Sequence, residues 1–153
     1  MSYSQLILVE YSIQFIEFSW NWLNDPEIKK LTNTPSFSKE DQLDFFHSLP
    51  ERKNYYIKGI VYNERPIGAC GLKNITDTDA EYWGYIGEKE FWGKGLGKQI
   101  MNKMIEKAKE LNLTSIYLIV IPDNPRAISL YQKMEFEIEN ESDKEIIMRL
   151  NLL

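Results

Sequence analysis

The 153-residue sequence has one cysteine and one histidine. The single thiol, Cys70, excludes an internal disulfide, and its apolar surroundings indicate a core residue in a reducing compartment. Cysteine and histidine form no ligand cluster, so the sequence predicts no metal site. It also lacks any run of ~18 apolar residues, and its N-terminus lacks a basic segment followed by an apolar one. We therefore expect neither a membrane span nor a signal peptide, and a cytoplasmic location.

Basic residues are fewer than acidic ones, at 18 Lys and Arg against 23 Asp and Glu, for a net charge of -5. This balance argues against a broad nucleic-acid-binding face, which needs a surplus of positive charge on one surface. Hydrophobic residues make up 43% of the chain, enough for one core without disulfides or metals. We predict a single domain over residues 1–153.

The hydrophobic pattern predicts an α/β order of elements. The expected strands are residues 5–9, 54–62, 67–72, 80–87 and 116–121, with two more within 136–150. The expected helices begin at Ser12, at Ser38 with Asp41 as its capping partner, near Leu96 and at Asn124-Pro125. Residues 24–36 are expected to be irregular, and the apolar strand 116–121 to be buried on both faces. The hairpin from 54 to 72 is antiparallel, whereas the strand, helix and strand from Tyr82 to Ile121 predict a parallel crossover.

A glycine-rich loop joins an expected strand to an expected helix, with the sequence Trp92-Gly93-Lys94-Gly95-Leu96-Gly97-Lys98. Its glycines leave backbone amides unshielded where the helix begins, and first-turn N–H groups together with the helix dipole favour a pyrophosphate there. Lys94 and Lys98 add positive charge. A tight turn with purely structural glycines is the alternative. The loop lacks both the Gly-Lys-Ser/Thr end of a Walker loop and the three-glycine dinucleotide spacing.

A second motif follows the apolar strand and runs from Asn124 to Phe136. Asn124 is a suitable N-cap, with Pro125 at the first helical position. Tyr131 comes seven residues later, two helical turns on, so both residues lie on one side of the helix and can face the same groove. A simple cap and a core aromatic are the alternatives.

Together the two motifs resemble the GNAT family of acetyl-coenzyme A-dependent N-acetyltransferases, from about Tyr55 to Phe136. Gly95-Leu96-Gly97 matches the end of the family's Gln/Arg-x-x-Gly-x-Gly/Ala loop, and the second motif matches Asn-x-x-Ala-x-x-Leu-Tyr-x-x-x-Gly-Phe. Trp92 replaces the usual Gln or Arg, and Glu135 the common Gly. The resemblance implies a GNAT fold, a mixed, mostly antiparallel sheet of six to seven strands that splays between the fourth and fifth and is flanked by about four helices.

The resemblance also implies the site. Acetyl-coenzyme A is the co-substrate, its diphosphate lies on residues 92–98, and Ile86 and Gly87 offer backbone hydrogen bonds to the pantetheine arm and the acetyl carbonyl. Asn124 and Tyr131 complete the cofactor site, and Tyr131 protonates the departing thiolate. Glu81 is the candidate base for the amine. Alternatively, Glu81 is only a carboxylate on the solvent side of a strand. A water relay or a carboxylate of the substrate pocket would then serve as the base, because the other position at which the family has a catalytic glutamate is Ile119 in this sequence.

The acceptor is a primary amine, expected to contact residues 24–49 and the loop 74–79. The run Ala80–Gly87 resembles acetyltransferases of nucleotide-linked amino sugars. Ile116-Tyr117-Leu118 with Asn124–Ala127 is similar to polyamine acetyltransferases, and Trp92–Gly95 to acetyltransferases of ribosomal-protein N-termini. A non-catalytic acetyl-coenzyme A sensor and a domain with purely structural glycines are alternatives of other classes. Edge strands at the C-terminus could also pair across a two-fold axis to form a homodimer.

Overall fold

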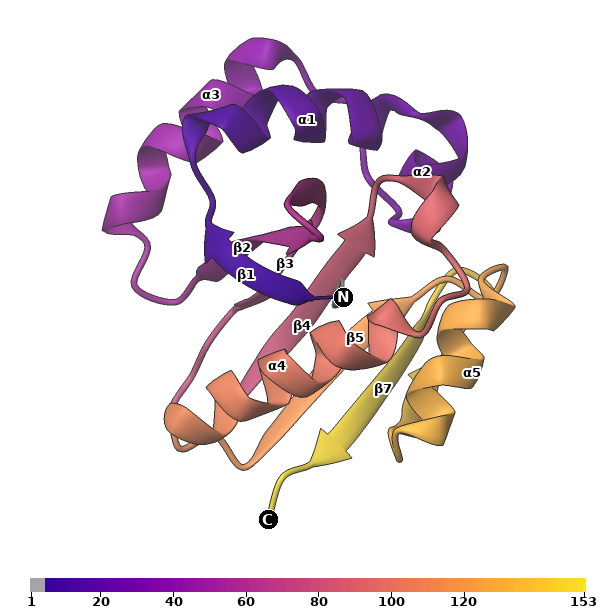
Figure 1. Ribbon diagram of the computed structural model, residues 1–153. Coiled ribbons are helices and arrows are strands. Elements are labelled where there is room, and N and C mark those ends of the chain that lie inside the picture. The colour runs from indigo at the N-terminus through magenta and orange to yellow at the C-terminus, as the bar shows by residue number, and fades with distance from the viewer. Residues whose placement is uncertain (1–4) are drawn as a thin grey trace.

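A computed structural model describes residues 5–153, whose strands form one seven-stranded sheet in the order β1-β2-β3-β4-β5-β7-β6 (Figure 1). The strands are β1 (Leu6–Glu10), β2 (Tyr56–Tyr62), β3 (Arg65–Lys73), β4 (Asp79–Ile86), β5 (Ser115–Val120), β6 (Glu137–Glu141) and β7 (Ile146–Asn151). The helices are α1 (Ile13–Asn24), α2 (Pro26–Leu31), α3 (Lys39–Ser48), α4 (Leu96–Glu110) and α5 (Pro125–Lys133), with 3₁₀ turns η1 (Leu49–Glu51) and η2 (Lys89–Phe91). This order confirms the predicted α/β class.

The sheet opens between its fourth and fifth strands. β4 and β5 are parallel, whereas all other neighbouring strands of the sheet are antiparallel. β4 and β5 pair only where Asp79–Glu81 meets Ser115–Tyr117, and beyond that point their carboxyl ends diverge. The predicted splay of a GNAT fold is therefore confirmed.

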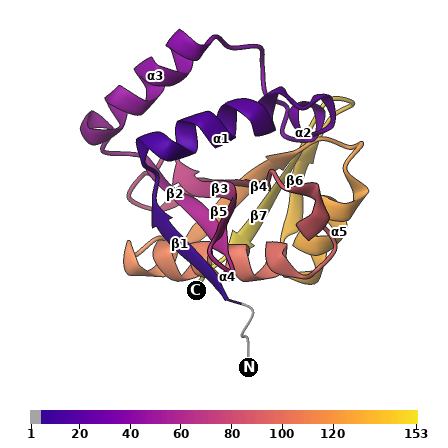
Figure 2. The same cartoon turned by 45° about the horizontal axis from the view of Figure 1, so that its top comes forward.

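Helices cover the sheet in two layers, with α1, α2 and α3 on one face and α4 and α5 on the other (Figure 2). α4 buries Leu96, Ile100, Met104 and Ala108, which recur every four residues and therefore lie on one side of the helix. They pack with buried residues of β3, β4, β5 and β7 into the larger core cluster. This packing fixes the start of α4 beside the end of β4.

A second core cluster lies under α1 and α2. Phe15, Trp22 and Ile28 are buried against residues of β1 to β4. A Cβ atom on Gly87 would lie 2.1 Å from the Trp22 ring, so only glycine lets this ring approach the backbone after β4. The N-terminal helices are thereby anchored over the carboxyl end of β4.

Two expectations from the sequence are wrong. Residues 24–36 contain α2, because Asp25 accepts hydrogen bonds from the Glu27 and Ile28 amides and caps a six-residue helix that starts with Pro26. β5 is not buried on both faces, since Ile119 is 43% exposed. The N-terminal helices pack on β1 to β4, so no helix within residues 5–153 covers this face of β5.

Candidate active site

The loop before α4 leaves its backbone open to a ligand. Gly93 and Gly95 have φ angles of 74° and 78°, in the left-handed region that favours glycine, and a Cβ on either would meet nothing within 4 Å. Gly95 is the N-cap of α4, and no side chain caps the helix. The first-turn amides are thus unshielded at the positive end of a helix, an arrangement that fits a diphosphate.

Asn124 and Tyr131 take the predicted positions on α5. The Asn124 side chain accepts a hydrogen bond from the Ala127 amide at 3.3 Å, which confirms the N-cap. Tyr131 packs between the rings of Tyr82 and Phe136, with centroids at 6.4 and 5.8 Å. Burial raises the pKa of Tyr131 to about 12, so its phenol is protonated at neutral pH and can donate a hydrogen bond.

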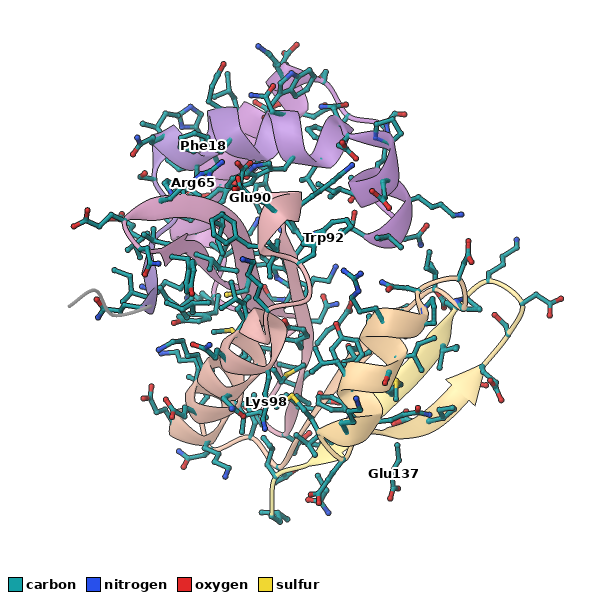
Figure 3. The ribbon with its side chains drawn as sticks, turned by 45° about the vertical axis from the view of Figure 1, so that its right-hand side comes forward. Phe18, Arg65, Glu90, Trp92, Lys98 and Glu137 are labelled. Carbon is teal, nitrogen blue, oxygen red and sulfur yellow. The ribbon has the colours of Figure 1, made fainter. Side chains whose placement is uncertain are left out.

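Trp92, which stands where the family usually has Gln or Arg, makes a hydrogen bond through its indole ring. Its Nε1 donates to the Ile86 carbonyl at 2.8 Å, and the guanidinium of Arg126 lies 5.6 Å from its ring centre. Figure 3 shows Trp92 between α2 and α5, whereas Lys98 lies on α4. The indole therefore joins the end of β4 to the start of α5 beside the loop.

At the end of β4, the backbone N–H groups of successive residues point alternately toward β3 and toward β5. The Gly87 amide donates to the Ile67 carbonyl at 2.6 Å, so it faces β3 and is not free to bind the cofactor. In an antiparallel pair the preceding residue points the other way, so the Ile86 N–H faces the opening toward β5. Ile86 is thus the backbone donor that the geometry places at the opening.

One cavity of about 910 Å³ connects this loop to a chamber beneath the N-terminal helices. The predicted site residues that line it are Ile86, Trp92, Gly93, Gly95, Leu96, Gly97, Lys98, Asn124 and Tyr131. The far part, which we call the acceptor chamber, is lined by Tyr11, Gln42, Phe45, Tyr55, Trp83 and Tyr85. Residues 24–49 contribute to the lining as expected, whereas the loop 74–79 does not.

Glu81 lies apart from these residues. It is 9% exposed, where β4 and β5 still pair, and its carboxylate accepts a hydrogen bond from Asn74 at 3.2 Å and lies 3.7 Å from Lys73 Nζ. Glu81 does not line the cavity, and neither do Gly87 and Lys94. The structure thus brings the loop and Tyr131 to one cavity and leaves Glu81 at the closed end of the splay.

Three hydroxyl groups meet at the wall of the acceptor chamber, where Tyr11 and Tyr85 line the cavity and Ser19 does not. The Tyr85 hydroxyl donates to Ser19 Oγ at 3.2 Å, and Ser19 Oγ lies 2.7 Å from the Tyr11 hydroxyl. Ser19 is fully buried, and Tyr11 is 8% exposed. These residues come from β4, α1 and the turn before it, so no spacing in the sequence indicates that they meet.

Every carboxylate that lines the cavity already has a partner. Glu27 pairs with Lys89, Asp123 with Lys30, and Asp41 accepts the Ser38 amide in the capping box of α3. Arg52, by contrast, has no carboxylate within 4.0 Å among residues 5–153. Its guanidinium lies 5.3 Å from the centre of the Phe45 ring and 5.6 Å from that of Tyr55, at the edge of the acceptor chamber.

The remaining candidates are structural. Cys70 is fully buried in β3, and burial raises the pKa of its thiol to about 12, as expected of a core residue. His47 is exposed on α3. Residues 5–153 contain no group of three or more His, Cys, Asp or Glu that could hold a metal. In the same part of the chain, no helix combines the length and the apolar character needed to cross a membrane.

Comparison with known proteins gives consistent matches. The model of the acetyltransferase (GNAT) family matches residues 16–136. Acetyltransferase PseH of Campylobacter jejuni strain 81-176 is 32% identical over 135 residues, which cover 86% of this chain and 83% of PseH. The crystal structure of C. jejuni PseH with acetyl coenzyme A covers 96% of this chain and 99% of its own, with a TM-score of 0.76 and 23% identity. The crystal structure of spermidine N-acetyltransferase from Vibrio cholerae with CoA and spermine covers 95% of this chain and 93% of its own, with a TM-score of 0.84 and 23% identity.

Proposed function

Because this chain belongs to the GNAT family of acetyltransferases, we propose that the amine it acetylates is carried by a nucleotide-linked amino sugar. The enzyme is an acetyl-coenzyme A-dependent N-acetyltransferase.

The pairing of charges around the cavity supports this acceptor. A polycationic amine is best held by free carboxylates, and those of Glu27, Asp41 and Asp123 are engaged within the protein. Arg52, which has no carboxylate partner among residues 5–153 and lies against the Phe45 and Tyr55 rings of the chamber, suits a phosphate group instead. Aromatic walls from Phe45, Tyr55 and Trp83 suit the flat face of a sugar or base.

We propose the following roles for the protein groups in the reaction. Acetyl-coenzyme A, when bound, supplies a thioester that a neutral amine can attack. The unshielded amides before and within the first turn of α4 hold its diphosphate, and the Ile86 N–H donates to the acyl part. The acceptor nitrogen loses a proton and the leaving sulfur gains a hydrogen bond from Tyr131.

Glu81 acts as the base through water in this proposal. Its carboxylate lies at the closed end of the splay and is held by Lys73 and Asn74, so it does not reach the cavity directly. An alkyl ammonium has a pKa near ~10, so some base or water relay must take its proton at neutral pH.

An acceptor screen tests the function. Coenzyme A release is followed with nucleotide-linked amino sugars, polyamines and peptide N-termini in parallel. The proposal expects the highest kcat/KM with an amino sugar. Preference for a polyamine overturns it in favour of the second candidate, which the match to the spermidine N-acetyltransferase structure supports. Preference for a peptide N-terminus indicates a protein N-terminal acetyltransferase, and cofactor binding without turnover on any amine indicates a sensor.

Three further properties belong to the proposal. We propose one domain over residues 1–153, because the described strands share one sheet. We propose a cytoplasmic location, because the single cysteine is a buried free thiol. We also propose a homodimer that pairs through the edge strand β6, whose five residues are all exposed.

A further inference from the structure

The hydroxyl groups of Tyr11, Ser19 and Tyr85 carry three protons but share only two contacts. The Tyr85 proton is accounted for, because Tyr85 donates to Ser19 Oγ. One proton of the remaining two lies between Ser19 and Tyr11. The other must point elsewhere, and which residue carries it decides what the acceptor chamber presents to a ligand.

Ser19 cannot be the residue with the spare proton. It is fully buried, so its proton has no access to water. Thr32 and Ser48 donate to backbone carbonyls of their own helices, but no such bond is found for Ser19 within residues 5–153. A buried hydroxyl proton without an acceptor costs about 1–3 kcal/mol. Because the Tyr85 hydroxyl is itself the donor in its bond to Ser19, Ser19 donates to the Tyr11 oxygen, which lies 2.7 Å away.

The Tyr11 proton is then free to leave the cluster. Tyr11 is one of the residues that line the cavity, and its oxygen accepts from Ser19, so a ligand in the acceptor chamber is the partner that its O–H can find. Burial raises the pKa of Tyr11, with partial relief from the Ser19 hydrogen bond, which keeps the phenol neutral and able to donate. Resting on the proposed function, we infer that Tyr11 is a specificity-determining residue that donates a hydrogen bond to an oxygen atom of the acceptor molecule.

This donor distinguishes two classes of amine. A sugar or its nucleotide offers hydroxyl, carbonyl and phosphate oxygens with lone pairs that accept from Tyr11. A protonated polyamine carries N–H donors only, so it offers no acceptor for the Tyr11 proton. The hydroxyl cluster therefore favours an oxygen-bearing acceptor independently of the charges at the edge of the chamber.

The test compares Tyr11→Phe with wild type on two acceptors, a nucleotide-linked amino sugar and an alkyl diamine without oxygen. We expect kcat/KM for the amino sugar to fall about tenfold, as for loss of one hydrogen bond, and kcat/KM for the diamine to stay within about twofold. Affinity for coenzyme A should not change. With a deoxy analogue of the sugar that lacks the recognised oxygen, wild type and Tyr11→Phe should have the same kcat/KM.

Matched variants separate recognition from folding. Tyr56→Phe, on the opposite face of the sheet against α4, should leave both acceptors unaffected. Ser19→Ala frees the Tyr11 hydroxyl to rotate and should give a smaller fall on the sugar alone. Activity is compared per folded enzyme, because Tyr11→Phe leaves the Ser19 proton without its acceptor and lowers the melting temperature.

The outcomes distinguish this inference from the proposed function. An equal loss on both acceptors, or none on the sugar, overturns the role of Tyr11 while the amino-sugar function stands. A wild-type enzyme that acetylates only oxygen-free amines overturns both. If a peptide amine proves to be the acceptor, the same comparison with that amine decides the role of Tyr11 although the proposed function has failed.

Discussion

Replacing Tyr131 by Phe removes one hydroxyl from the point where the cavity passes between β4 and α5. The ring keeps its contacts with Tyr82 and Phe136, so the packing should survive and the change should act on chemistry. No protein group accepts from the Tyr131 hydroxyl in the described part of the chain. Its loss therefore breaks no internal hydrogen bond.

The magnitude follows from the pKa. The pKa of Tyr131 is about 12, whereas that of an ordinary thiol is about 8.5. Full proton transfer to the thiolate would be uphill by about 5 kcal/mol, so Tyr131 stabilises the leaving sulfur as a hydrogen-bond donor. A hydrogen bond to a charged group contributes about 1.5–3 kcal/mol, which corresponds to a fall in kcat of about 10- to 150-fold.

Single-turnover acetyl transfer and calorimetric binding of coenzyme A measure the two effects separately. We expect the rate of acetyl transfer to fall in that range while the Kd for coenzyme A changes less than about twofold. The wild-type phenol keeps its proton until the pH approaches 12, so Tyr131 should cause no alkaline decline between pH 8 and 10. An unchanged rate with acetyl transfer shown to be rate-limiting would refute the role of Tyr131.

Three other variants test the site around it. Gly95→Ala places a Cβ at a φ of 78° and should cost ~1–2 kcal/mol of unfolding free energy and weaken coenzyme A binding; unchanged values for both would exclude this turn as the diphosphate site. Arg52→Ala should raise KM for a nucleotide-linked amino sugar about tenfold or more, lessened by salt, and an equal effect from Lys53→Ala would contradict a specific phosphate contact. Cys70 should react with iodoacetamide only on unfolding, because its pKa of about 12 keeps the thiol protonated; rapid modification of the native protein at pH 8 would contradict its burial.

The sequence predicts those helices and strands that are indicated by residues close together along the chain. The start of α4 near Leu96, the Ser38–Asp41 capping box and the Asn124-Pro125 start of α5 each depend on residues close together along the chain, and all three occur as predicted. α2 has the same kind of signal in Asp25-Pro26. A proline after a helical segment is typical of a helix end, which favours an irregular segment over residues 24–36, but proline also suits the first position of a new helix.

The acceptor chamber could not be predicted in the same way. Tyr11, Ser19 and Tyr85 come from separate elements, and their hydroxyls meet only because α1 packs on the face of β4. The exposed face of β5 has a similar origin. An apolar run indicates burial, but which face receives a helix depends on where α1 to α3 end, and this is a property of the whole fold.

The short pairing of β4 with β5 leaves backbone amides in the diverging part without a strand partner. Pantetheine contains two amide groups of its own, so a cofactor laid in the opening would act as a short extra strand. In hydrogen–deuterium exchange, coenzyme A should slow amide exchange most in residues 84–86 and 118–120, and much less in the fully paired β2 and β3.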